Sequence, residues 1–127
     1  MRHDILTLAT ATGEKKIDIE VAVTINEQTH GLMFRTALPD TSGMLFPYSP
    51  PRELTMWMKN TYLSLDMVFI RADGIVHRIE ARTEPLSETV ISSNGAMAAV
   101  LELAGGAAER LGLKPGDRVI FAPAPTK

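Results

Sequence analysis

The stretch LDMVFIRADGIVHRIEAR, residues 65–82, contains the strongest fold signal in the chain. Asp73 and Gly74 stand side by side between two apolar runs. An Asp-Gly pair in this position is typical of the two-residue turn of a β-hairpin. The runs on either side, 65–72 and 75–82, therefore predict two paired antiparallel strands.

Apolar patterns on both sides of this hairpin predict further strands. Ile17, Ile19, Val21 and Val23 alternate with polar or small residues, which is typical of a half-buried strand. Other short strands are expected at residues 5–10, 43–46, 53–60, 98–103 and 118–121. Turns or loops are expected between them at 12–13, 48–51, 62–64, 93–95 and 115–116.

Two short helices are expected between the strands. Thr24 followed by Glu27 is a capping box, in which each residue bonds the backbone of the other, so a helix should begin at Thr24 and run to about Phe34. Gly31 inside it costs about 1 kcal/mol relative to Ala and should permit a close backbone approach. The second helix is expected over residues 105–112.

These elements predict a mainly β (α+β) fold. Seven to eight short strands with two short helices are typical of a small antiparallel β-barrel or rolled sheet. Rolling the sheet removes exposed strand edges. The length fits a single domain, 1–127, with a flexible tail at 122–127.

Composition excludes several classes of function. The chain has no cysteine, which removes disulfides, thiolate metal sites and cysteine nucleophiles. Its net charge is −2 and its longest basic run is two lysines, so a nucleic-acid partner is not expected. No run approaches the roughly 18 apolar residues of a transmembrane segment.

The segment TMWMKNTYLSLDM, residues 55–67, carries the candidate site. Beside Trp57, the side chains of Lys59, Asn60 and Asp66 could hold a small polar ligand, such as a sugar hydroxyl or a peptide carbonyl. Alternatively, Asp66 accepts backbone N–H groups of the 61–64 turn and Lys59 only neutralises it. Buried polar groups of this kind are more often structural, so we favour the second interpretation.

Arg35 is expected at the end of the first helix, at the edge of this patch. Its planar guanidinium could bind an anionic ligand. A simpler expectation is that it bonds the last carbonyls of its helix or the carboxylate of Asp40.

Two further functions stay open at this point. Asp66 or Glu102 could act as the acid or base of an enzyme on small polar or glycan substrates. Five of the seven methionines, which could bind Cu(I) or simply fill the core, fall within one third of the chain: Met33, Met44, Met56, Met58 and Met67. The three histidines stand on unrelated elements, so no zinc site is predicted.

Several motifs together resemble the domain-of-unknown-function family 192, also called uncharacterised protein family 0127. They are HGLMFR (30–35), GMLF (43–46), WMKNT (57–61), LDMVFI (65–70), ADGIV (72–76) and VLELAGGAAERLGLKPGD (100–117). The resemblance covers about residues 5–121 and departs from the family pattern at Met56 and Ser64, where Phe and Pro are more usual. It implies a compact, mostly β domain without an established function. It also implies export behind a signal peptide or lipid anchor, so a periplasmic or secreted location is expected, although this chain shows no signal peptide and a cytoplasmic location stays open.

We therefore predict a non-enzymatic binding or accessory module outside the cytoplasm. Its predicted binding residues are Arg35, Trp57, Lys59, Asn60 and Asp66. No catalytic residue, metal or cofactor is predicted. The partner would be a small polar ligand, a glycan or a protein, and the sequence leaves the oligomeric state open.

Overall fold

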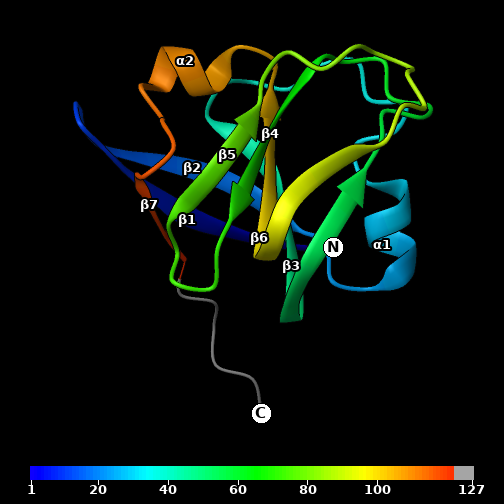
Figure 1. The fold of residues 1–127 in the computed structure, drawn as a ribbon. Coiled ribbons are helices and arrows are strands. Elements are labelled where there is room, and N and C mark those ends of the chain that lie inside the picture. Colours follow the sequence, from blue (N-terminus) through cyan, green and yellow to red (C-terminus); the bar gives the residue numbers. More distant parts are fainter. Residues whose placement is uncertain (122–127) are drawn as a thin grey trace.

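Seven strands and two short helices make up residues 1–121, the part of the chain that the computed structural model describes (Figure 1). The strands are β1 (Arg2–Thr10), β2 (Gly13–Val21), β3 (Ser42–Met56), β4 (Leu65–Ile70), β5 (Val76–Glu80), β6 (Ile91–Ala104) and β7 (Arg118–Ile120). The helices are α1 (Ile25–His30) and α2 (Ala107–Leu111). The tail predicted at 122–127 lies outside the described residues. Neither helix is long and apolar enough to cross a membrane.

All seven strands belong to one sheet, in the order β5-β4-β6-β3-β2-β1-β7. The neighbours pair antiparallel except β2 and β3, which are parallel. The two ends of the sheet meet, because the Val76 N–H donates to the Asp117 carbonyl and the Val119 N–H donates to the Gly74 carbonyl, both at 2.8 Å. The predicted fold class, a mainly β rolled sheet with two short helices, is confirmed, with one parallel pair among the antiparallel ones.

The hairpin at residues 65–82 forms as predicted from β4 and β5. Gly74 has φ +83, which a residue with a side chain rarely adopts. The same glycine offers its carbonyl to Val119, so the turn joins both the hairpin and the two ends of the sheet.

Two predicted breaks in the strands are wrong. Residues 48–51 belong to one continuous β3, and 93–95 belong to β6. The pairing of β3 with β6 shifts register between Pro47 and Arg52, so the prolines lie in an irregular stretch that needs no N–H donor. The chain leaves the sheet after Met56, and residues 57–60, predicted as strand, belong to a loop.

Helix α1 begins with the predicted capping box. The Glu27 N–H donates to the Thr24 hydroxyl at 3.1 Å, and the Thr24 N–H donates to the Glu27 carboxylate at 3.0 Å. The helix ends at His30, four residues earlier than predicted, because Gly31 takes φ +50 and caps its C-terminus. A Cβ on Gly31 would lie 3.4 Å from the Phe46 ring, so the glycine also permits close packing.

The sheet buries apolar side chains on both faces. One core cluster lies inside the roll and draws on all seven strands; Val68 and Ile70 are its members from β4. The second cluster lies on the opposite face of the central strands β3, β4 and β6 and contains Met67 and Phe69. Every residue of β4 is buried, because the strand alternates between the two clusters.

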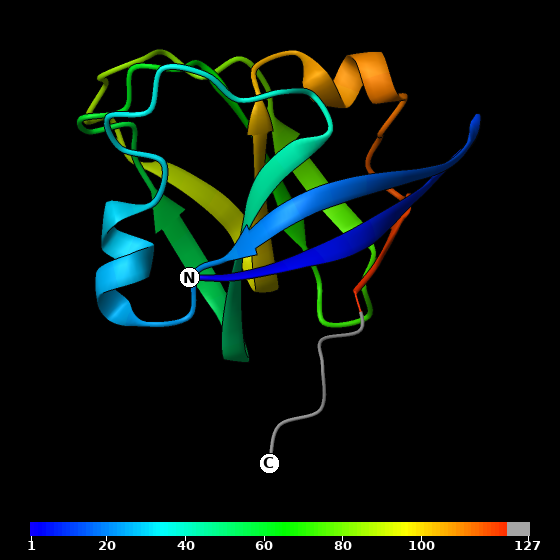
Figure 2. The same cartoon turned by 180° about the vertical axis from the view of Figure 1, so that it is seen from behind.

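The covering segments gather at one end of the roll. The loops 31–41, 57–64 and 81–90 lie together there, and α1 and α2 lie on opposite sides of the molecule (Figures 1 and 2). Leu32 and Met58 come from two of these loops and are buried in the second cluster. The loops therefore position side chains over that cluster, where the candidate site lies.

Candidate functional site

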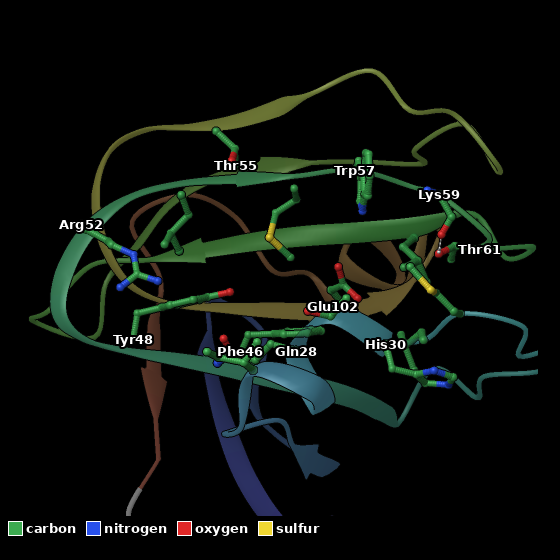
Figure 3. Close-up of a pocket in the computed structure, with 18 of the residues that line it drawn as sticks. Gln28, His30, Phe46, Tyr48, Arg52, Thr55, Trp57, Lys59, Thr61 and Glu102 are labelled. Atoms are coloured by element: carbon green, nitrogen blue, oxygen red, sulfur yellow. Dashed lines mark hydrogen bonds between the residues drawn. The ribbon is translucent and has the colours of Figure 1, made fainter.

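A pocket of about 480 Å³ opens over the second core cluster (Figure 3). Its lining comes from α1 and the residues 31–33 that follow it, from β3 between residues 46 and 56, from the loop at 57–61, and from one residue each of β4 and β6. The central part of the pocket has Trp57 on one side and Glu102 opposite it, with Tyr48 reaching in from one end. Such a volume lies in the usual range for small-molecule sites.

Glu102 is the buried acid of this pocket. Its neighbours in the sheet are Met44 on β3 and Met67 on β4, both fully buried, and its own side chain is only 4% exposed. Burial raises the pKa of the Glu102 carboxyl to about 8. Because burial is the only cause of this shift, no hydrogen-bond donor or positive side chain among the described residues counteracts it. At neutral pH the carboxyl is therefore mostly protonated.

At the rim of the pocket, two aromatic rings each contact a positively charged side chain. The Arg52 guanidinium lies 4.9 Å from the centre of the Tyr48 ring, and the Lys59 ammonium lies 5.1 Å from the centre of the Trp57 ring. Each pair is a cation–π contact. Burial raises the pKa of the Tyr48 phenol; the nearby Arg52 lowers it, while Glu102 adds to the increase.

Helix α1 is fastened at the side of the pocket by Gln28. Its amide nitrogen donates to the carbonyls of Ala22 at 3.0 Å and of Pro47 at 3.1 Å. These bonds tie the helix to β3 just before Tyr48. His30, two residues further along α1, also lines the pocket (Figure 3).

Of the five predicted binding residues, Trp57 and Lys59 line this pocket. Asn60 does not: it has φ +56, its side chain is exposed, and its carbonyl accepts the Phe34 N–H at 2.9 Å. Asn60 thus serves the turn at the end of the 57–60 segment through its backbone carbonyl.

Arg35 also lies outside the pocket. It binds Glu20 on β2 with two hydrogen bonds, at 2.6 and 2.9 Å, and the Arg35 guanidinium lowers the pKa of that carboxyl. Asp40, one of the two kinds of partner expected for Arg35, instead accepts hydrogen bonds from Arg110 at 2.6 and 2.8 Å.

Asp66 is held by backbone donors on the inner side of β4. Its Oδ1 accepts the N–H groups of Arg82 at 2.8 Å and Gly106 at 2.9 Å, and its Oδ2 accepts that of Ala108 at 2.9 Å. The favoured interpretation placed these donors in the 61–64 turn; they come from the segment after β5 and from the start of α2. Lys59 forms no ion pair with Asp66 in the described chain.

The pocket residues that sequence reasoning missed are Gln28, Tyr48 and Arg52. Tyr48 and Arg52 flank a proline-rich stretch that resembles a loop, so no strand pattern showed that they face inward. Glu102 had a usable signal: it is the one charged residue in the apolar run VLELA. A lone acid on a strand buried on both faces indicates a group that is either paired or placed for function.

The five methionines between residues 33 and 67 divide into two groups. Met44, Met58 and Met67 are buried in the second core cluster, and the Thr83 hydroxyl lies 3.1 Å from the Met58 sulfur. Met33 and Met56 line the pocket and are the two that a soft metal could reach. Copper binding stays a prediction. No group of three His, Cys, Asp or Glu side chains within residues 1–121 is placed to hold a metal ion.

Comparisons with known proteins agree with this architecture. The model of the DUF192 family, described as "Uncharacterized ACR", matches residues 7–121. A crystal structure of a candidate transcription regulator from Sinorhizobium meliloti 1021 is similar with a TM-score of 0.90 and 42% identity, over 93% of this chain and 92% of that one. A protein of unknown function from Novosphingobium aromaticivorans DSM 12444 is similar with a TM-score of 0.91 and 43% identity, over 94% and 85% of the two chains.

No curated protein matches the chain. The family match nonetheless covers nearly all of the described residues, and both solved structures share more than 40% of their residues with this chain. On these grounds the chain belongs to the DUF192 family.

Proposed function

We propose that this protein is a binding module that takes a small polar ligand in the pocket between α1, β3 and β6. The observation that carries the proposal is Glu102, a buried carboxyl that faces the pocket and has no compensating partner in the described chain. No side-chain oxygen or nitrogen among the described residues is both fully buried and unpaired, so the free oxygens of this carboxyl are reached from the pocket. A ligand in the pocket can therefore bond them directly.

The walls of the pocket support the same function. Trp57 and Tyr48 offer aromatic surface against which a flat or ring-shaped ligand can lie, and Glu102 offers a hydrogen-bonding group between them. A protonated carboxyl both donates through its O–H and accepts through its carbonyl oxygen. Hydroxyl, carbonyl and carboxylate groups of a ligand fit this donor and acceptor pair.

A nuclear magnetic resonance screen of small polar compounds tests the proposal. Resonances of pocket residues should shift in the wild type and fail to shift in Trp57→Ala. Tyr62→Ala is the matched control, because Tyr62 is an aromatic residue of the same loop with 52% exposure that does not line the pocket. Equal binding by wild type and Trp57→Ala would contradict the proposal.

A second candidate function is an enzyme in which Glu102 is the general acid or base. A carboxyl with a pKa near the working pH that opens into a pocket is suited to proton transfer. Asp66, the other residue considered for this role, is saturated by three backbone N–H groups. Turnover of glycoside or ester substrates that Glu102→Gln abolishes would support the enzyme, and binding without turnover would favour the binding module.

The location outside the cytoplasm is also a proposal, which rests on the resemblance noted from the sequence. Fractionation of the native host, with an antibody against this chain, tests it directly. Recovery in the periplasm or medium would support export, and recovery with cytoplasmic markers would contradict it.

A further inference from the structure

We infer that the ligand of this pocket is a small organic anion, bound between Arg52 and Lys59, with the Glu102 carboxylic acid donating a hydrogen bond to its body. The inference rests on the proposed function and deepens it by assigning the chemical class of the ligand. A terminal carboxylate or phosphate supplies the charge, and a hydroxyl, carbonyl or carboxylate oxygen reaches Glu102.

The first support is that the two rim cations have no anionic partner. Six arginines form ion pairs elsewhere in the molecule: Arg2, Arg35, Arg71, Arg78, Arg82 and Arg110. Within residues 1–121, Arg52 and Lys59 form none and rest on aromatic rings instead. Other cations of the described residues also lack an ion pair, but Arg52 and Lys59 are the two that line the pocket. A guanidinium packed on an aromatic face keeps the N–H groups at its edge available for an anion.

The second support is the charge balance of the pocket. Beyond the two cations, the titratable side chains that line it are His30 from α1, Tyr48 and Glu53 from β3, and Glu102 from β6. Glu53 is exposed and accepts the Ser92 hydroxyl at 3.1 Å, and burial keeps Glu102 mostly uncharged at neutral pH. Two cations, Arg52 and Lys59, therefore stand against one ionised carboxylate, Glu53, so the pocket carries a net positive charge, which favours anions.

The third support is the arrangement of these groups. Arg52 and Lys59 stand at opposite ends of the pocket, and Trp57 and Glu102 face each other between them (Figure 3). An anion anchored at either end can extend its body along the Trp57 ring toward Glu102. A cationic ligand would instead meet a like charge at both ends. Apart from the exposed Glu53 at the Arg52 end, its acidic partner would be Glu102, which would first have to ionise in a buried site.

Probes of similar size and different charge test the inference. One set is glucuronate, glucose and glucosamine, and the other is 4-hydroxybenzoate, 4-hydroxybenzamide and 4-hydroxybenzylamine. In each set, we expect the anion to shift the pocket resonances at a concentration about tenfold lower than the neutral and cationic probes need. A tenfold difference is the gain in affinity that one charge-assisted contact provides.

Substitution of either rim cation tests the same inference from the side of the protein. Arg52→Gln or Lys59→Gln should weaken the binding of the anions about tenfold and leave the binding of neutral probes unchanged. Lys114→Gln is the control, because this exposed lysine does not line the pocket.

Proton linkage gives a second, independent readout. An anion beside Glu102 disfavours the ionised carboxyl, so binding raises its pKa and takes up protons at pH 8. Calorimetry in buffers of different ionisation enthalpy measures this uptake, which Glu102→Gln should abolish. Glutamine keeps an N–H donor there, so binding itself should persist.

The outcomes separate the two proposals. If neutral or cationic probes bind the pocket as tightly as anions and depend on Trp57, the anionic ligand is refuted and the binding module stands. If no probe of any charge shifts the pocket resonances, both are refuted. Proton release on anion binding would also overturn the inference.

Discussion

At the scale of single residues, Glu102 and Asp66 are the two buried carboxyl side chains of the described chain, and their surroundings are opposite. Asp66 accepts three backbone N–H groups, while burial alone determines the pKa of Glu102. Side chains that are satisfied in this way stabilise a fold, whereas an uncompensated one destabilises it. One acid therefore belongs to the scaffold and the other to the pocket.

The raised pKa of Glu102 predicts how stability depends on pH. The folded carboxyl titrates at about 8 and its usual value is 4.5, so between these values the folded chain binds more protons than the unfolded one. The free energy of unfolding should fall as pH rises through that window and level off above it. Glu102→Gln cannot ionise and should be more stable than the wild type at pH 9 by on the order of 3 kcal/mol, with the difference fading toward pH 5.

Urea unfolding at pH 5, 7 and 9 measures this effect. Glu53→Gln is the control, since it removes an exposed carboxyl from the same pocket. Parallel pH profiles for the wild type and Glu102→Gln would show that the buried carboxyl is compensated by a group other than those seen here.

Asp66→Asn should destabilise the protein by about 3 kcal/mol, because an amide removes the charge that the three N–H groups bond. It also turns an NH₂ group toward backbone N–H donors. Thermal and urea unfolding would give the loss in free energy of unfolding, with Asp18→Asn on the exposed face of β2 as the control. A loss below about 0.5 kcal/mol, the range of ordinary surface substitutions, would exclude this structural role.

The sequence predicts some residues of the site and not others, and the reason differs from residue to residue. Trp57 and Lys59 fall in the pocket because they are near neighbours in one short loop. Arg35 pairs with Glu20, a residue on a different strand, and no local pattern shows which strand lies beside the 31–41 loop. The proposed role of Glu102 depends on its burial. Burial of a polar residue arises only when the strands assemble into the sheet, so the sequence alone does not reveal it.

At the scale of elements, local chemistry predicted the turns and caps well. The Asp-Gly hairpin and the Thr24–Glu27 capping box form as expected, because both depend on contacts within a few residues. The length of β3 and of β6 was mispredicted, since prolines and an Asn-Gly pair are tolerated where the partner strand shifts its register. The prediction therefore divided β3 into two strands, and the part that carries Arg52 and Met56 was not joined to the part at 43–46.

The close approach of β3 to β6 gives a test at this scale. A Cβ on Gly43 would lie 2.6 Å from the Glu102 carbonyl oxygen, inside the distance that backbone atoms tolerate. Gly43→Ala should push β3 away from β6 and lower the free energy of unfolding by about 2 kcal/mol or more. Ser42→Ala, one residue earlier on the same strand, is the control and should change stability by less than about 0.5 kcal/mol. Equal stability of the two variants would mean that the strands separate at no cost.

At the scale of the whole molecule, one sheet supports two cores with different roles. The cluster inside the roll is enclosed by all seven strands and closed where the hairpin turn meets β7. The cluster on the other face is covered by loops, and the pocket opens above it. The roll closes at its end strands, β5 and β7, whereas the pocket lies over the outer face of the central strands. One should therefore be open to disturbance without the other.

Gly74→Ala tests this separation. Gly74 has φ +83, a value that strains alanine, and a Cβ there would lie 3.1 Å from the Val119 carbonyl oxygen. The substitution should therefore strain the turn and push it against β7. Amide hydrogen exchange should become faster at Val76 and Val119, whose N–H groups form the closing bonds. The amides of the β3–β6 pair should keep their protection, and pocket resonances should keep their positions, because the strained contact is remote from the second cluster. Uniform loss of protection across β3 and β6 would show instead that the two cores open as a single cooperative unit.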